Sequence, residues 1–320
     1  MTIRQRIVTC AGILAVALFG SGAVATASAA NLFAKVSQTG TLLGGSGVSK
    51  VSWLGPGQYE VTFTSDVSRC AYVATTANAY SQALQAYTAG GHLNANGVFI
   101  ETKNQGGGLT NGPFHLIVNC GAPKLKYAVV GYSSELVRAT AGATLNELGP
   151  GRYNITFLES VSACAYLATV ADPGNALVFA PSGVYTGSGP NSRTVYIETK
   201  NPGGGLQGGI PFHLSVICST APSSRMAVVN SSGLPSRASS LTSSFKAARG
   251  QYIAATNANI AACATVATRG SVSTSVPFAP ATIEIVPGPA ANTIGIEVRD
   301  LLFFGGARNN AAFHAATVCP

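Results

Sequence analysis

Three polar side chains recur in order along this chain: a glutamate, a cation two residues later, and a histidine further on. The nine positions are Glu101, Lys103, His115, Glu198, Lys200, His213, Glu297, Arg299 and His314. A carboxylate, an ammonium and an imidazole in one site could transfer protons. On a strand the glutamate and the cation share one face, and we expect the histidine face of the next strand beside them. Since no nucleophile recurs there, we interpret the cluster as a cross-strand polar ladder on the solvated side of a sheet.

Other catalytic signatures are weak. Asp66 corresponds to Ser160 and Asn259 in the other copies described below, so no Ser-His-Asp set recurs, and no Gly-x-Ser-x-Gly elbow occurs. The glycine triplets 106–108 and 203–205 lack the Lys-Ser/Thr of a phosphate-binding loop, and we interpret them as turns. No Cys-x-x-Cys spacing indicates a zinc site. We therefore predict no catalytic residue, no bound cofactor and no metal ligand.

The polar triplet belongs to a longer repeat. The first copy reads GPGQY (55–59), CAYVAT (70–75), IETKN (100–104) and PFHL (113–116), and the second reads GPGRY (149–153), CAYLAT (164–169), IETKN (197–201) and PFHL (211–214). The third keeps GQY (250–252), CATVAT (263–268) and FH (313–314), but it lacks the glycine triplet and has Thr265 where a tyrosine stands. The spacing of about 95 residues is that of small domains. We place them at 30–122, 123–221 and 222–320, in series and held close by short proline-containing connections.

Each copy shows the alternation of half-buried strands. Tyr59, Val61 and Phe63 alternate with polar residues, and the second copy repeats the pattern. Seven or eight short strands in 95 residues predict an all-β protein of three tandem β-sandwich domains, immunoglobulin-like or jelly-roll. Helical periodicity is confined to one window, 78–88, which we assign to a short helix.

Two cysteines recur at matching places in every copy. We predict the disulfides Cys70–Cys120, Cys164–Cys218 and Cys263–Cys319, because the first partner opens a strand and the second closes the last strand. Closing a loop of about 50 residues contributes roughly 4 kcal/mol in the chain-entropy description.

The first 29 residues have the pattern of a secretory signal peptide. Arg4 and Arg6 precede an apolar stretch, and Ala27-Ser28-Ala29 forms a small-x-small cleavage site. An uncleaved anchor is the alternative interpretation. Cys10 lies inside the apolar stretch and would be lost with it. We predict a secreted or extracellular protein with no transmembrane anchor after cleavage, in an oxidising environment that favours disulfides.

The charge pattern limits the partners. Only 9% of the 320 residues are charged and the net charge is +8, with Lys124 and Lys126 as the densest pair of cations. Nucleic-acid binding needs clustered cations, so we exclude it.

The segments 76–97, 171–193 and 269–292 differ most between copies, and we treat Tyr80, Tyr87 and Tyr185 within them as candidate ligand-binding residues. A glycan or cell-surface polymer is the partner we consider; tolerant surface loops are the other interpretation. The sequence leaves the oligomeric state open.

The motifs Gly-x-Gly-x-Tyr-x-x-x-Phe, Cys-Ala-Tyr-Val-Ala-Thr and Phe-His-Leu-x-x-x-Cys together resemble a tandem, cysteine-bridged repeat of exported bacterial proteins. The resemblance covers nearly all of the mature chain and implies no activity and no site residues. We expect a secreted, non-catalytic surface, adhesion or ligand-binding protein. A secreted hydrolase with a degenerate third repeat is the alternative, and a deep pocket with convergent polar groups would favour it.

Overall fold

The computed structural model describes residues 32–77, 83–122, 124–176, 182–221, 224–273, 280–301 and 306–320. Within these ranges the chain forms 24 strands. The predicted signal peptide and Tyr80 lie outside the described residues. The described part of the chain contains no helix with the length and apolar character needed to cross a membrane.

The first unit is a sandwich of two four-stranded antiparallel sheets. Its inner sheet has the order β2 (Leu42–Ser46), β1 (Leu32–Val36), β8 (Phe114–Asn119), β5 (Ala71–Thr76). Its outer sheet has the order β3 (Val48–Gly55), β4 (Gln58–Phe63), β7 (Gly97–Lys103), β6 (Gln85–Gly90). The alternating Tyr59, Val61 and Phe63 are buried between the sheets, as predicted.

The second and third units repeat this strand order. The second has inner strands β10 (Leu136–Ala139), β9 (Leu125–Val130), β16 (Phe212–Cys218), β13 (Cys164–Val170) and outer strands β11 (Thr144–Gly149), β12 (Arg152–Thr156), β15 (Thr194–Lys200), β14 (Gly183–Ser188). The third has inner strands β18 (Pro235–Ser239), β17 (Ser224–Val229), β24 (Phe313–Val318), β21 (Ala264–Arg269) and outer strands β19 (Leu241–Ala248), β20 (Gln251–Thr256), β23 (Thr293–Asp300), β22 (Ala281–Pro287). The all-β sandwich class is confirmed. The proposed domain boundaries fall between β8 and β9 and between β16 and β17.

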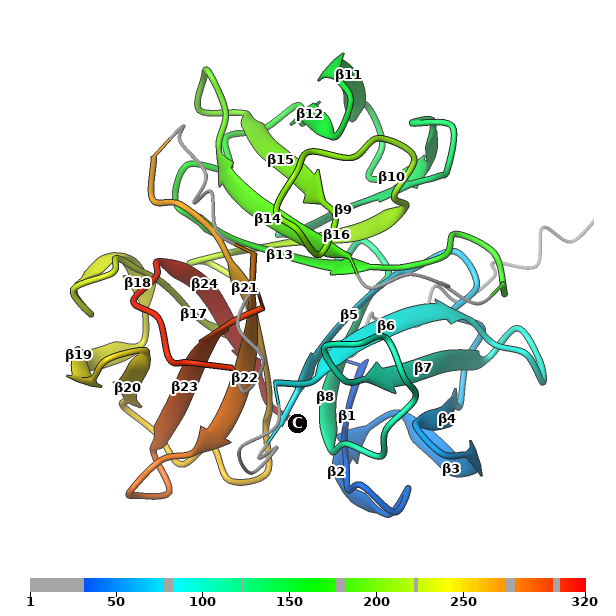
Figure 1. Cartoon of the computed structure of the whole chain (residues 1–320), viewed down its shortest axis with the longest axis horizontal. Helices are drawn as coiled ribbons and strands as arrows, with labels where there is room; N and C mark the ends of the chain where they lie inside the picture. Colours follow the sequence, from blue (N-terminus) through cyan, green and yellow to red (C-terminus); the bar gives the residue numbers. More distant parts are fainter. Residues whose placement is uncertain are drawn as a thin grey trace, which may run out of the picture.

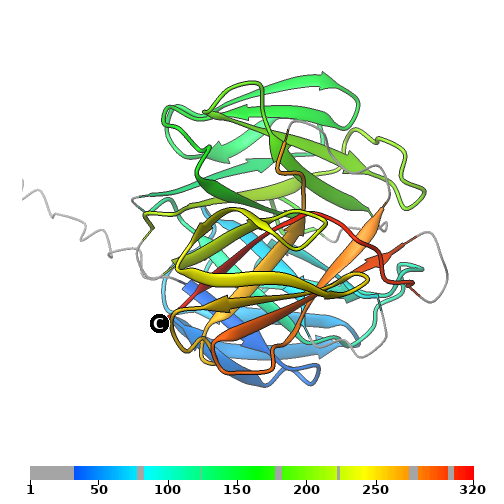
Figure 2. The same ribbon diagram turned by 90° about the vertical axis from the view of Figure 1, so that its left-hand side faces the viewer.

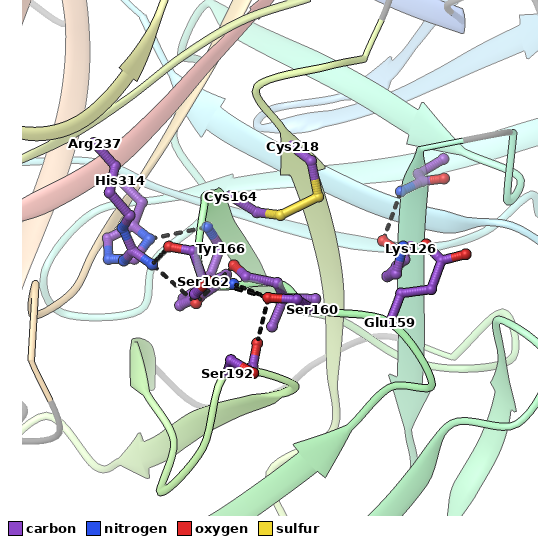
Figure 3. Close-up of a disulfide and its surroundings, with 12 residues drawn as sticks. Lys126, Glu159, Ser160, Ser162, Cys164, Tyr166, Ser192, Cys218, Arg237 and His314 are labelled. Carbon is purple, nitrogen blue, oxygen red and sulfur yellow. Dashed lines mark hydrogen bonds and ion pairs between the residues drawn. A yellow bond between two sulfur atoms is a disulfide. The ribbon is translucent and has the colours of Figure 1, made fainter.

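The three disulfides pair as predicted, and each joins the ends of two neighbouring strands of an inner sheet, as Figure 3 shows for Cys164–Cys218. The short helix predicted over 78–88 is wrong where the structure describes it, because residues 85–88 belong to strand β6.

The three units are packed around a common axis rather than strung out in series. Strands β5, β13 and β21 meet at the centre of Figure 1, and the inner sheets face one another there. Figure 2 shows the same packing from the side, with the C-terminus at one edge of the assembly. A shared apolar cluster fills the centre, with Phe33, Val73, Leu167, Val228 and Val266 among its members. The inner sheets are therefore covered on both faces, which explains why every residue of β5, β13 and β21 is buried.

The repeated Ala-Thr pair of the cysteine motif forms hydrogen bonds between neighbouring units. Each threonine hydroxyl accepts the N–H and donates to the carbonyl of the corresponding alanine in a neighbouring unit. The pairs are Thr75 with Ala267 (2.9 and 2.9 Å), Thr169 with Ala74 (2.9 and 3.1 Å) and Thr268 with Ala168 (2.8 and 3.0 Å). The three pairs form a closed ring, so the first unit contacts the third as it contacts the second. We call these contacts the 1–2, 2–3 and 3–1 joints.

Candidate functional site

The recurring glutamates and cations form buried ion pairs. Lys103 Nζ lies 2.8 Å from Glu101 Oε2, and the corresponding distances are 2.9 Å for Lys200–Glu198 and 2.6 Å for Arg299–Glu297. Glu101 and Lys103 are only 3% and 4% exposed, so the predicted solvated ladder is wrong. The glutamates and the histidines also lie in different sheets of each unit, because β7 and β8 do not pair. The structure therefore separates the histidines from the glutamate–cation pairs with which they could have transferred protons.

The two candidate tyrosines among the described residues lie in strands near the axis instead of in exposed loops. Tyr87 on β6 and Tyr185 on β14 are 2% and 1% exposed. Lys103 and Lys200 lie over their rings at 5.1 and 5.3 Å from the centroids. The prediction that these two tyrosines offer a surface to a ligand is wrong, because the neighbouring units cover them.

The two tyrosines instead hold the units together, and Glu284 takes their place in the third unit. The Tyr87 hydroxyl accepts the Ser182 N–H at 3.2 Å, and the Tyr185 hydroxyl accepts the Ala281 N–H at 3.3 Å. Glu284 Oε1 accepts the Leu84 N–H at 2.9 Å and completes this second ring. Burial raises the pKa of Glu284 to about 8. A protonated Glu284 is uncharged, like the tyrosines at the corresponding positions.

Tyr87 and Tyr185 line a small cavity on the axis. Its volume is about 80 Å³, and its lining includes Tyr87, Tyr185 and Arg269. Ligand pockets usually measure about 300–1,000 Å³, so the cavity is too small for anything beyond a few waters. We therefore assign the axial cluster to assembly of the three units.

The histidines hold the joints. His213 Nδ1 accepts the Tyr72 N–H at 2.9 Å across the 1–2 joint, and His314 Nδ1 accepts the Tyr166 N–H at 2.9 Å across the 2–3 joint. At the 3–1 joint, His115 Nδ1 lies 3.1 Å from the N and 3.0 Å from the O of Thr265. Burial and a nearby cation lower the pKa of His115 and His314 to about 3, and that of His213 well below its usual value. All three are neutral crosslinks between units at physiological pH.

Two joints are also filled by an arginine beside a tyrosine, a pair that we call the plug. At the 2–3 joint Arg237 lies over the Tyr166 ring, 4.8 Å from its centroid, and donates to the Tyr166 hydroxyl and to the Ser162 carbonyl, both at 2.9 Å. Figure 3 shows Arg237 and His314 on the same side of Tyr166. At the 1–2 joint Arg138 takes this position, next to Tyr72, and donates from Nε to the Cys70 carbonyl at 3.2 Å.

The 3–1 joint lacks the plug. Strand register places Gly44 where Arg138 and Arg237 stand, and the repeat places Thr265 where Tyr72 and Tyr166 stand. Lys35 occupies the position of Val129 and Val228, and its Nζ donates to the Ala261 carbonyl at 2.6 Å. That carbonyl corresponds to the one Arg237 contacts at Ser162. Two large side chains are thus replaced by glycine and threonine.

A groove of about 780 Å³ lies at this joint between the first and third units, and Lys35, Leu43 and Thr265 are among its lining residues. This volume lies within the usual range of ligand pockets. The apolar part of its lining comes from β1, β2, β22, β23 and the segments before β8 and β21, with Val36, Leu43, Pro113, Ile260, Ile285 and Ile294 as its larger side chains. Lys35 and His115 are the ionisable groups among the lining residues. Lys35 forms no ion pair with any carboxylate of the described residues.

The histidine of the groove is held in place and is a weak base. The ring of His115 is held by the Thr265 backbone, and a base with a pKa of about 3 accepts protons poorly at neutral pH. Among the described residues, no three His, Cys, Asp or Glu side chains gather as a metal site. Comparisons with protein-family models, with curated proteins and with solved structures found no significant match to this chain.

Proposed function

We propose that this protein is an exported, non-catalytic ligand-binding protein whose binding site is the groove at the 3–1 joint. The observation that carries the proposal is the loss of the plug at this joint while the rest of the contact is kept. The threonine–alanine exchange and the histidine contact are present at all three joints. The differences between copies at Lys35, Gly44 and Thr265 therefore converge on one place in space, although they lie far apart in the sequence.

Export rests on the three disulfides together with the signal-like first 29 residues. The glycan partner loses its basis in Tyr87 and Tyr185, because both are buried. The apolar lining of the groove favours a ligand with a large apolar part instead. The hydrolase alternative gains no support, because the described lining of the groove has a weakly basic histidine and no carboxylate that could help to activate a nucleophile.

Nile red, a neutral apolar dye that fluoresces in apolar surroundings, tests the site. We expect the full chain to bind it, and we expect the double variant Gly44→Arg/Thr265→Tyr, which rebuilds the plug, to lose most of that binding. The backbone tolerates the first change, since a Cβ on Gly44 would lie 3.4 Å from the Ala262 carbonyl oxygen and 3.7 Å from Lys35 Cδ.

The matched control is Leu158→Arg, which adds the same charge at an exposed position in the second unit. It should bind the dye like the unmodified chain. Absence of binding to the unmodified chain, or equal binding by the plugged variant, would contradict the proposed function.

A further inference from the structure

We propose that the groove takes an amphipathic monoanion, an apolar chain or ring system that ends in a single anionic group, and that Lys35 binds this group. The inference rests on the proposed function and names the chemical class of the ligand. Its starting point is the contrast between a large apolar lining and one cation without an acidic partner among the described residues.

Lys35 has donors left to bind an anion. An ammonium has three N–H donors, and the hydrogen bond to the Ala261 carbonyl uses one of them. Arg237 is the cation at the 2–3 joint, where it lies over the Tyr166 ring and also donates a hydrogen bond to the Tyr166 hydroxyl. Lys35 has no such ring, because Thr265 stands in place of the tyrosine. A partly buried cation with unused donors favours an anionic partner over a neutral one.

The position of Lys35 is also unusual among the three copies. Its counterparts Val129 and Val228 are fully buried apolar side chains packed inside their joints. The first unit thus has a cation on an inner strand at a position where the other two units have valine. That cation lines the groove. The joint that loses two large side chains at Gly44 and Thr265 therefore also gains a cation at Lys35.

The remaining lining limits the charge and shape of the ligand. Lys35 is the one charged side chain among the lining residues at neutral pH, because His115 is neutral there. A second negative charge would have no counter-charge in apolar surroundings, so a singly charged group is favoured. Val36, Leu43, Pro113, Ile260, Ile285 and Ile294 offer apolar surface to the rest of the molecule.

Isothermal titration with three ligands of equal chain length tests the head group: decanoate and decyltrimethylammonium below their micelle concentrations, and decanol below its solubility limit. The account predicts that decanoate binds at least about tenfold more tightly than decanol, as a charge-assisted hydrogen bond would give, and that the cation binds least. Lys35→Met should remove the preference for decanoate and keep the binding of Nile red. Lys50→Met removes one exposed lysine on β3 and is the control for net charge; it should keep the preference.

Failure of this inference is distinct from failure of the proposed function. Nile red binding with equal affinities for decanoate and decanol, or an unchanged preference in Lys35→Met, would overturn the role of Lys35 and leave the groove as a binding site. Equal loss of preference in Lys50→Met would assign it to overall charge and also overturn the inference. A chain that binds neither the dye nor any of the three ligands would overturn both.

Discussion

The 2–3 joint and the 3–1 joint use the same backbone contacts and differ in what fills them. In both, a histidine Nδ1 meets the backbone of the neighbouring unit two residues after the first cysteine. In both, a threonine exchanges hydrogen bonds with an alanine on the axis. Arg237 and Tyr166 fill the 2–3 joint, whereas a groove of about 780 Å³ lies at the 3–1 joint.

The contacts that hold the units together are thus distinct from the side chains that differ between the joints. The threonine–alanine and histidine hydrogen bonds form at the 3–1 joint as well as at the two filled joints. The plug is therefore not needed to hold the first unit to the third. Two copies can therefore each lose one large side chain at their shared joint, where a groove lies, without losing their places in the assembly. Repetition supplies the scaffold, and the groove lies at the one joint where the copies diverge.

The largest expected effect tests whether the disulfides of the second and third units stabilise their β-sandwiches equally, although the joints of the units differ. Removing either Cys164–Cys218 or Cys263–Cys319 by paired Cys→Ala changes should lower the free energy of unfolding by roughly 4 kcal/mol, because the loops have similar lengths, with separations of 54 and 56 residues. Urea unfolding measures both losses. A much smaller loss for the third unit would show that its divergence extends to the framework and would break the comparison.

The next effect compares the joints directly. His314→Ala leaves the buried Tyr166 N–H without a partner and should lower stability by roughly 3 kcal/mol. His115→Ala should lower it by about 1 kcal/mol, because water in the groove can reach the Thr265 N–H. Equal losses in the same urea experiment would indicate that the 3–1 joint is as closed as the others.

The pH dependence of stability tests the replacement of tyrosine by Glu284 on the axis. Its pKa in the folded chain is about 8, above the ordinary value of 4.5, so between these pH values the folded state binds more protons than the unfolded state. Glu284 therefore makes stability fall as the pH rises from about 5 to 8, by at most roughly 1.4 kcal/mol per pH unit. Glu284→Gln should remove this decline, and a parallel decline in the variant would contradict the assignment.

Histidine titration acts in the opposite direction at lower pH. The folded-state pKa values of His115 and His314 are about 3, below the ordinary value of 6.5, so the unfolded state binds more protons between these values. Stability should therefore be lost as the pH falls from about 6.5 towards 3. In His314→Ala this acid loss should be smaller than in the unmodified chain, and an equal loss would show that His314 does not contribute to it.

The smallest effect is expected at a largely exposed ion pair of the second unit. Lys126 Nζ and Glu159 Oε2 are 2.7 Å apart, but the Glu159 side chain is 76% exposed. Glu159→Gln should leave the unfolding midpoint unchanged within error, since exposed ion pairs contribute little. A clear shift of the midpoint would show that surface charges are as important as the buried contacts that distinguish the joints.

The framework could be predicted from the sequence because the repeat supplies its own comparison. Two cysteines per copy define the disulfides, and the alternation around Tyr59 and Tyr153 identifies half-buried strands. The packing of the units could not be predicted, because a period of two shows which face a residue takes and not what covers that face. The unbroken burial of β5 had a visible signal: the run AYVATT contains no charged residue.

The candidate site was missed for a related reason. Tyr87 and Tyr185 stand in segments that vary between copies, and such variation is typical of loops, yet these segments also hold the edge strands β6 and β14. Thr265 was visible as a departure from the repeat. Gly44, which replaces the other side chain of the plug, belongs to another unit. Only the packing of the three units around the axis brings Gly44 and Thr265 to one joint.

A crystal structure of the full chain with bromine-labelled decanoate tests the central claim most directly. The account predicts one bromine site, in the groove at the 3–1 joint, with the carboxylate about 3 Å from Lys35 Nζ. Bromine at the filled joints, equal occupancy of all three joints, or binding confined to the outer surface would contradict it.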